Sequence, residues 1–88
     1  MRKFKTQLQS YLCNVLARSR HDRGITQEKM AELLYLTTRA YGSLERGKSG
    51  FSAVTVILFL ALLSDEGIVR VVRDFARLLP ELEENEFD

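Results

Sequence analysis

The chain has 88 residues, of which 45% are hydrophobic and 28% charged, with five glycines and one proline. This composition is typical of one compact domain and excludes a disordered tail or a two-domain enzyme. A chain of this length buries only about 60% of its unfolded surface, so pairing with a second chain is a reasonable way to gain stability. The single cysteine, Cys13, excludes an intrachain disulfide and a zinc site built on two thiolates.

The charges divide unevenly between the two parts of the chain. Residues 1–50 carry ten Lys or Arg and four Asp or Glu, a balance of +6, whereas residues 51–88 carry three and eight, a balance of −5. This asymmetry favours a basic part that meets a polyanion and an acidic end kept away from it, although scattered solvated charge is the simpler alternative. No apolar run follows the basic N-terminal residues, so we expect no secretory signal and a reducing, cytoplasmic, nucleoid-associated location.

Apolar residues at helical spacing predict a first helix from Lys3 to Arg20, with Gly24 in the left-handed conformation that closes a helix. A second helix is expected from Gln27 to about Leu34, with Thr26 as its N-cap. Its inward side chains should be Met30, Ala31 and Leu34.

A third helix is expected over Thr38–Arg46, with Thr37 as N-cap and Gly47 after its end. Tyr41 and Leu44 should face inward from it.

The fourth and fifth helices are the most apolar parts of the chain. Residues 51–63 are apolar at nearly every position, which indicates a helix capped by Ser52 with both faces covered, either in the core or by a partner. A strand over 53–60 is the alternative, but it would have no partner strand. Ser64 should cap a fifth helix, which Pro80 ends or kinks, before a short acidic tail at 81–88. The segment 51–63 is too short to span a bilayer, so we expect no membrane insertion.

Residues 27–46 have the layout of a helix-turn-helix, because two short helices are joined by about three residues. Ala31 is small enough to let the second helix approach the first. The outward side of the second of these helices carries small, polar or charged residues, namely Thr38, Arg39, Gly42, Ser43 and Arg46. Such a surface suits the major groove of DNA.

Three sequence stretches, at 24–28 (Gly-Ile-Thr-Gln-Glu), 30–34 (Met-Ala-Glu-Leu-Leu) and 44–48 (Leu-Glu-Arg-Gly-Lys), resemble the phage-repressor-like (Cro/cI, Xre) helix-turn-helix regulators. The resemblance runs from Gly24 to about Leu63. It implies an all-α, five-helix, lambda-repressor-like domain over residues 1–80, which binds operator DNA as a dimer and is expected to act as a transcriptional regulator of the repressor type.

Carried onto this chain, the resemblance assigns the DNA contacts. Gln27, Thr37 and Thr38 would contact phosphate or base, and Arg39, Ala40 and Ser43 would face base edges, while Arg46 and Lys48 would hold phosphate. The dimer would form through apolar residues of the fourth and fifth helices, namely Ile57, Leu60, Val71, Val72, Phe75, Leu78 and Leu79.

Two positions depart from the pattern of this family. Tyr35 stands where a turn glycine is usual, which predicts an uncommon positive φ and a distorted turn. Tyr41 replaces a branched aliphatic residue, so its hydroxyl should reach solvent or a hydrogen-bond partner.

Other patterns in the chain favour ordinary structure. Residues 42–49 match the phosphate-loop pattern Gly-x-x-x-x-Gly-Lys-Ser, but no strand precedes them, so we expect no nucleotide chemistry. His21 is the only histidine and Cys13 lies near an apolar face, so we predict no metal site, no cofactor and no catalytic residues.

Two other functions remain open. Leu78-Leu79-Pro80-Glu81 resembles the ending of small Xre-type antitoxins, so the chain could bind a toxin protein and repress its own operon. A helix-turn-helix fold that has lost DNA binding and only assembles proteins is the third alternative.

Overall fold

The computed structural model describes the backbone of residues 2–79 and the side chains of residues 4–79. Two expectations therefore lie outside the described residues, the acidic tail at 81–88 and the role of Pro80 in ending the last helix.

Five helices and no strand make up the described part of the chain, so the prediction of an all-α fold is confirmed. Their bounds are α1 Arg2–Arg23, α2 Gln27–Leu33, α3 Thr38–Glu45, α4 Ala53–Ala61 and α5 Asp65–Ala76. The bounds of α2, α3 and α4 agree with the expected ones to within about two residues, and α1 runs three residues beyond the predicted end.

A hydroxyl side chain caps the N-terminus of each helix from α2 to α5, as predicted. The Oγ atoms of Thr26, Thr37, Ser52 and Ser64 each accept a hydrogen bond of 3.0–3.1 Å from the backbone N–H three residues ahead. These bonds satisfy amide groups that a helix start leaves without a partner, and they fix where each helix begins.

The C-termini of α1, α2 and α3 close in one common way. Gly24, Tyr35 and Gly47 take φ values of 66°, 59° and 73°, and the residue after each donates its backbone N–H to a carbonyl five residues back. This is the Schellman motif, in which a left-handed residue lets the chain satisfy the last carbonyls of a helix. Tyr35 has the expected positive φ, but its turn is not distorted, because the Leu36 N–H to Ala31 oxygen distance is 2.9 Å.

The core lies where α1, α2, α3 and α4 meet. Its fully enclosed side chains include all five that we predicted to face inward from α2 and α3, and the cluster consists of Leu16, Met30, Ala31, Leu34, Tyr41, Leu44 and Phe59. Burial of apolar side chains on this scale is the main stabilising contribution in a domain of this size.

Helix α4 covers this core with only one of its faces. Thr55 and Phe59 are buried, whereas Val54 and Ile57 are 69% and 64% exposed. The expectation that both faces are covered is therefore not met within one chain, and the apolar outer face is free for a partner.

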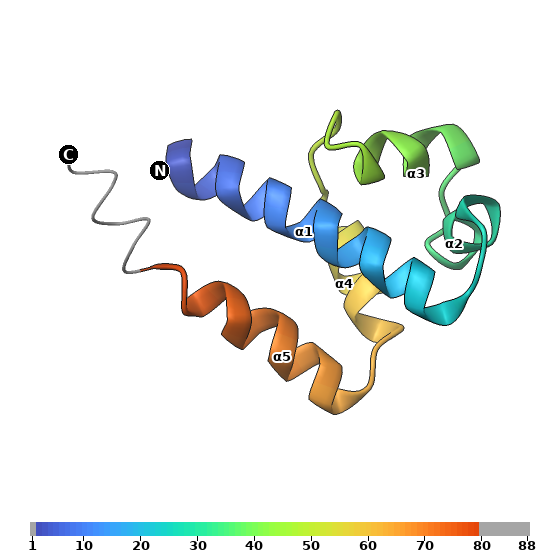
Figure 1. The fold of residues 1–88 in the computed structure, drawn as a ribbon. Helices are drawn as coiled ribbons and strands as arrows, with labels where there is room; N and C mark the ends of the chain where they lie inside the picture. Colours follow the sequence, from blue (N-terminus) through green and yellow to red (C-terminus); the bar gives the residue numbers. More distant parts are fainter. Residues whose placement is uncertain (1, 80–88) are drawn as a thin grey trace.

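Helix α5 lies along α1, on the side of α1 opposite α3 (Figure 1). The ring of Phe75 lies 5.3 Å from that of Tyr11, and the Tyr11 hydroxyl donates a 2.7 Å hydrogen bond to the Val71 carbonyl. No side chain of α5 is buried, and Val69 and Val72 face solvent. This helix therefore has an apolar stripe that α1 covers only in part.

None of the helices described between residues 2 and 79 combines the length and the apolar character needed to cross a bilayer.

Candidate nucleic-acid interface

Helices α2 and α3 pack against each other and are joined by residues 34–37. Thr37, Thr38, Arg39 and Ala40 are all exposed and lie in the first turn of α3 or just before it. The Thr37 hydroxyl accepts from the N–H of Ala40, so it already serves as a helix cap. Arg39 is the cation of this group, and its exposed guanidinium is free to meet a base edge or a phosphate.

The other end of α3 carries a second group of exposed cations, Arg46 and Lys48. The guanidinium of Arg46 extends over Gly42, where an added Cβ would lie only 2.9 Å from the Nη1 atom of Arg46. The backbone N–H of Lys48 donates to the Ser43 carbonyl and so closes the helix. Together with Ser43, which is half-buried and lies between them in the sequence, the polar and basic residues of these two groups are named the row on α3.

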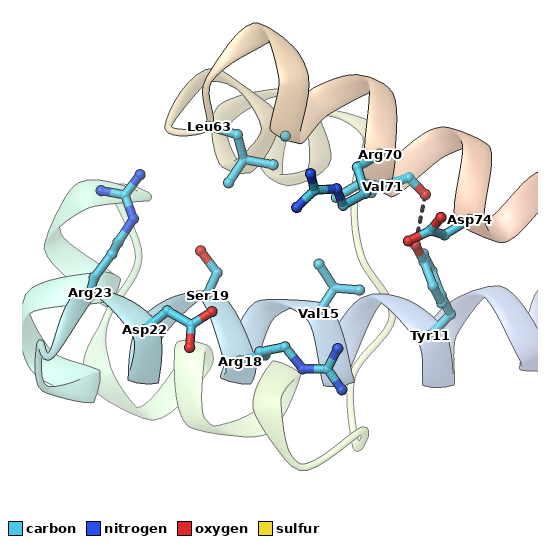
Figure 2. Close-up of a pocket in the computed structure, with 11 residues that line it drawn as sticks. Tyr11, Val15, Arg18, Ser19, Asp22, Arg23, Leu63, Arg70, Val71 and Asp74 are labelled. Carbon is cyan, nitrogen blue, oxygen red and sulfur yellow. Dashed lines mark hydrogen bonds between the residues drawn. The ribbon is translucent and has the colours of Figure 1, made fainter.

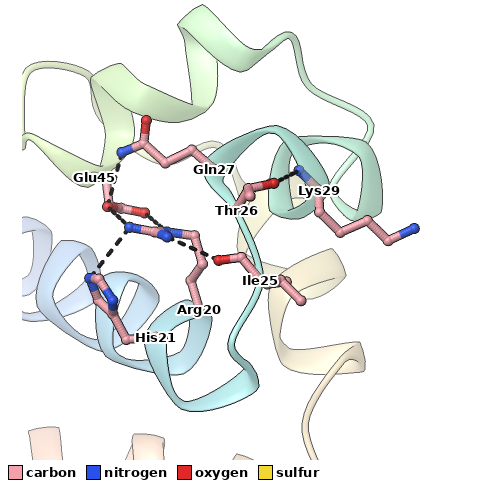
Figure 3. Close-up of polar contacts among 7 residues, drawn as sticks. All are labelled: Arg20, His21, Ile25, Thr26, Gln27, Lys29 and Glu45. Atoms are coloured by element: carbon pink, nitrogen blue, oxygen red, sulfur yellow. Dashed lines mark hydrogen bonds and ion pairs between the residues drawn. The ribbon is translucent and has the colours of Figure 1, made fainter.

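The side-chain amide of Gln27 makes one hydrogen bond inside the protein. Its Nε2 atom donates a 3.2 Å hydrogen bond to Oε1 of Glu45 (Figure 3). The second N–H of this amide and its Oε1 atom remain available, so the predicted contact of Gln27 with DNA is compatible with this hydrogen bond.

The Glu45 carboxylate also forms an ion pair with Arg20, a contact that the sequence analysis did not predict. Arg20 Nε donates to Glu45 Oε2 at 2.8 Å and Nη2 donates to Oε1 at 3.0 Å, and the two side chains are only 13% and 10% exposed. Arg20 Nη1 further donates to the Ile25 carbonyl at 3.0 Å. The pair therefore ties the end of α3 to the end of α1 and to the loop before α2 (Figure 3).

The protonation of this pair reflects its contacts. The hydrogen bond from Arg20 is the main cause that lowers the pKa of Glu45 from 4.5 to about 2, and the amide of Gln27 adds to it. The bond to Glu45 likewise raises the pKa of Arg20. Both groups stay charged at neutral pH, so α3 is held by a partly buried ion pair with two parallel hydrogen bonds.

Tyr41 departs from its expected hydrogen bonding. The side chain is fully buried, and its hydroxyl lies near Glu45 without reaching the geometry of a hydrogen bond to any described group. Burial, and then the Glu45 carboxylate, raise the pKa of Tyr41. The expectation that this hydroxyl finds solvent or a partner is wrong, because the core closes over the whole ring.

Gln9 on α1 holds the loop that carries Lys48. Its Nε2 atom lies 3.2 Å from the Ser49 carbonyl and 3.4 Å from the Gly47 carbonyl. The residue is 38 positions or more from either partner, so helical periodicity alone could not have indicated this contact.

The residues predicted to form a dimer divide into two sets. Ile57, Val72, Leu78 and Leu79 are 64%, 55%, 40% and 38% exposed, as a contact surface requires. Leu60 instead packs against the core, and Val71 and Phe75 are half-buried with Tyr11 of α1. The exposed apolar surface therefore includes Ile57 and Val72, whereas Leu60, Val71 and Phe75 are used in packing within the chain.

A groove of about 450 Å³ separates α1 from α5 (Figure 2). Its walls carry both signs of charge, with Arg18 and Asp22 on α1 and Arg70 and Asp74 on α5. The Tyr11 hydroxyl and Val71 carbonyl close one part of it (Figure 2). Because opposite charges alternate along these walls, the groove shows no preference for one kind of ligand.

The patterns interpreted as ordinary structure can also be located. The phosphate-loop match begins inside α3, where Gly42 is buried in the middle of the helix. The Cys13 thiol donates to the Ser10 carbonyl of its own helix. Among residues 4–79, no three His, Cys, Asp or Glu side chains gather into a group that would hold a metal ion.

Comparison of the chain with protein-family models, with curated proteins and with solved structures finds no match.

Proposed function

We propose that this protein is a sequence-specific DNA-binding regulator of transcription, acting as a repressor, in which α2 and α3 form a helix-turn-helix. The observation that carries the proposal is the row on α3, whose exposed polar and basic residues lie at the two ends of the helix, Thr37, Thr38 and Arg39 at one and Arg46 and Lys48 at the other. The row lies on a helix whose inner face is buried and whose end is fixed by Arg20 and Glu45. A rigid helix of this kind can present side chains to base edges in a fixed register.

The two cationic ends of α3 would have different tasks. Arg39, at the start of the helix, would enter the major groove and donate two parallel hydrogen bonds to a guanine. Lys48, in the loop after the helix, would meet the phosphate backbone, which carries no sequence information. The ten Lys and Arg residues within positions 1–50 would add a salt-dependent attraction to any DNA duplex.

A dimer would place two copies of α3 in successive major grooves, about 34 Å apart. The exposed residues Ile57 and Val72 support a pairing through α4 and α5. Since α5 lies on the side of α1 opposite α3, such pairing would leave the row on α3 free (Figure 1).

The test is a binding titration by fluorescence anisotropy. The probe is a duplex from the region upstream of the protein's own gene, and a scrambled duplex is the control, both at two salt concentrations. We expect tighter binding to the upstream duplex and weaker binding to both duplexes at the higher salt, because released counterions drive part of the association. Equal affinity for the two duplexes, or no binding at low salt, would contradict the proposal.

Two substitutions separate the proposed tasks. Replacing Arg39 with Ala should cost about 1–3 kcal/mol on the specific duplex and little on scrambled DNA, because it removes a base contact. Replacing Lys48 with Ala should weaken binding to both duplexes alike and reduce the salt dependence, because it removes a phosphate contact. Equal losses on both duplexes for both variants would refute these roles.

The exposed stripe of α5 also favours a second candidate, an antitoxin that binds a toxin protein and represses its own operon. Val69 and Val72 are 57% and 55% exposed, and such an apolar helix face fits a groove on another protein. A toxin gene beside this one, and co-purification of the two products, would support this function over a regulator that acts alone.

A further inference from the structure

Three helices of this chain end in the same left-handed turn, but only one of them uses a large residue there. Gly24 and Gly47 close α1 and α3, whereas Tyr35 closes α2 with φ 59°. The hydrogen bonds of the three turns are alike, so their backbones require the same conformation. Glycine takes this conformation without steric conflict and a tyrosine does not, so Tyr35 destabilises the turn in which it lies.

No packing of the Tyr35 side chain within the folded chain offsets this strain. The side chain of Tyr35 is 83% exposed, in contrast to Tyr41, which is fully buried. A ring that faces solvent to this extent adds no packing to the core. Residues held in such sparsely populated backbone conformations cluster at active sites, ligand-binding sites and switch regions.

The position of Tyr35 relates it to the row on α3. It lies two residues before Thr37, the cap of α3, and four before Arg39, so its turn leads directly into the proposed recognition helix. Helix α5, which carries exposed apolar residues, lies on the other side of α1, away from the turn between α2 and α3 (Figure 1). A nucleic acid seated on α3 is therefore a nearer partner for this ring than a protein seated on α5.

We propose that Tyr35 is a DNA-contact residue, whose phenol donates a hydrogen bond to a phosphate oxygen and whose ring lies against the adjoining deoxyribose. This inference rests on the proposed function and adds a contact to it, at a position where the family that the sequence resembles usually has glycine. Tyrosine hydroxyls are among the ordinary donors to DNA phosphates, and such contacts fix the register of a protein on the duplex.

The experiment compares the wild type with Tyr35→Gly and Tyr35→Phe, in unfolding by urea and in binding to the upstream and scrambled duplexes. Tyr35→Gly should raise the urea midpoint, because it relieves the strained φ, and should raise the dissociation constant about tenfold on both duplexes. Tyr35→Phe should leave the urea midpoint unchanged and weaken binding to a smaller extent, because it keeps the ring and loses only the donor. The salt dependence should stay the same in both variants, since a neutral hydroxyl displaces no counterion.

Opposite changes in stability and affinity are the signature of this role, because a merely structural residue would move both in one direction. Tyr35→Gly with wild-type affinity would overturn the assignment while leaving DNA binding intact. A lower urea midpoint for Tyr35→Gly would overturn it as well, because the ring would then belong to the fold. If the wild type itself binds neither duplex, that result contradicts the proposed function, and the proposed contact of Tyr35 is overturned together with it.

Discussion

Glu45 lies at the end of α3, yet its carboxylate belongs to the inside of the protein. It receives two hydrogen bonds from Arg20 and one from Gln27, and it lies near the buried ring of Tyr41. One carboxylate thus links α1, α2 and α3 at the place where the proposed recognition helix ends. The geometry of Arg46 and Lys48, the next cations along the chain, depends on this anchor.

Glu45 also makes the stability of the fold depend on pH. Its pKa is lowered from 4.5 to about 2 in the folded state, so the ionised form stabilises folding above pH 4.5 and this contribution is lost as the pH falls towards 2. At neutral pH the shift corresponds to about 3 kcal/mol. We expect Glu45→Gln to lower the free energy of unfolding by about that amount at pH 7, and by only about 1 kcal/mol at pH 3.

Urea unfolding at the two pH values measures this difference. Glu32→Gln is the matched control, because Glu32 is an exposed carboxylate of α2 whose contact with Lys29 is 3.8 Å long. It should change the unfolding free energy little at either pH. A gap between wild type and Glu45→Gln that is the same at pH 7 and pH 3 would show that the ionisation of Glu45 does not contribute.

Single residues also show what the sequence could and could not predict. Ser and Thr before a helix and Gly after it act locally, so Thr26, Thr37 and Gly47 were predicted correctly. Arg20 and Glu45 are 25 residues apart, and neither residue type nor spacing indicates that they meet. The hydrogen bond from Gln27 to Glu45 could not be predicted for the same reason, because the two residues are 18 positions apart.

At the scale of helices, apolar periodicity predicted α2 and α3 well because each has a single buried face. It predicted α4 less well, since a helix that is apolar all round does not show which face the core covers. The structure buries Phe59 and leaves Ile57 in solvent, a choice made by the neighbouring helices rather than by α4 itself. Periodicity does not predict contacts between a helix and a distant loop, such as those of Gln9 with Gly47 and Ser49.

Gln9 provides a test at this scale, because one amide joins α1 to the loop after α3. Gln9→Met keeps a side chain of similar length and removes the donor to Gly47 and Ser49. We expect a loss of about 1 kcal/mol in unfolding free energy and faster hydrogen exchange of the backbone amides between residues 47 and 50. Binding to specific and scrambled duplexes should weaken equally, since Lys48 lies in this loop.

Gln7→Met on the same helix is the control, because Gln7 is exposed. It should leave both the exchange rates of the loop and the affinity for DNA unchanged. Unchanged exchange in Gln9→Met would mean that the Schellman turn at Gly47 alone holds the loop.

At the scale of the whole molecule, the two proposed surfaces are separated by α1. Helix α3, which carries the row, is on one side of α1, and α5, which carries the exposed stripe, is on the other (Figure 1). Helix α3 belongs to residues 1–50, which have a net charge of +6, and α5 belongs to residues 51–88, which have a net charge of −5. The sequence analysis predicted a basic part and an acidic end kept apart from it, but it did not predict that α1 lies between α3 and α5.

Val72→Asp tests the pairing surface without disturbing the fold. Val72 is 55% exposed, whereas Phe75 lies against Tyr11, so Asp at Phe75 would disturb the attachment of α5 as well as any dimer. We expect sedimentation to show a dimer for the wild type and a monomer for Val72→Asp, because a buried unpaired carboxylate is costly. The affinity of Val72→Asp for a duplex with two half-sites should also be lower than that of the wild type, since the second half-site is no longer bound by a linked copy.

Val72→Thr, which has nearly the same shape, is the control and should remain largely dimeric. Circular dichroism should show the same helix content in all three proteins. An unchanged sedimentation mass for Val72→Asp would remove α5 from the pairing surface.

Because no side chain of α5 is buried, this helix opens at a lower free-energy cost than the core of the protein. Proteases cleave such opened segments, at rates that follow how often they open. Under the proposed pairing, a second copy covers the stripe only when the protein is abundant enough to associate. Scarce copies would then be degraded faster than abundant ones, so the lifetime of the protein in a cell would rise with its own concentration.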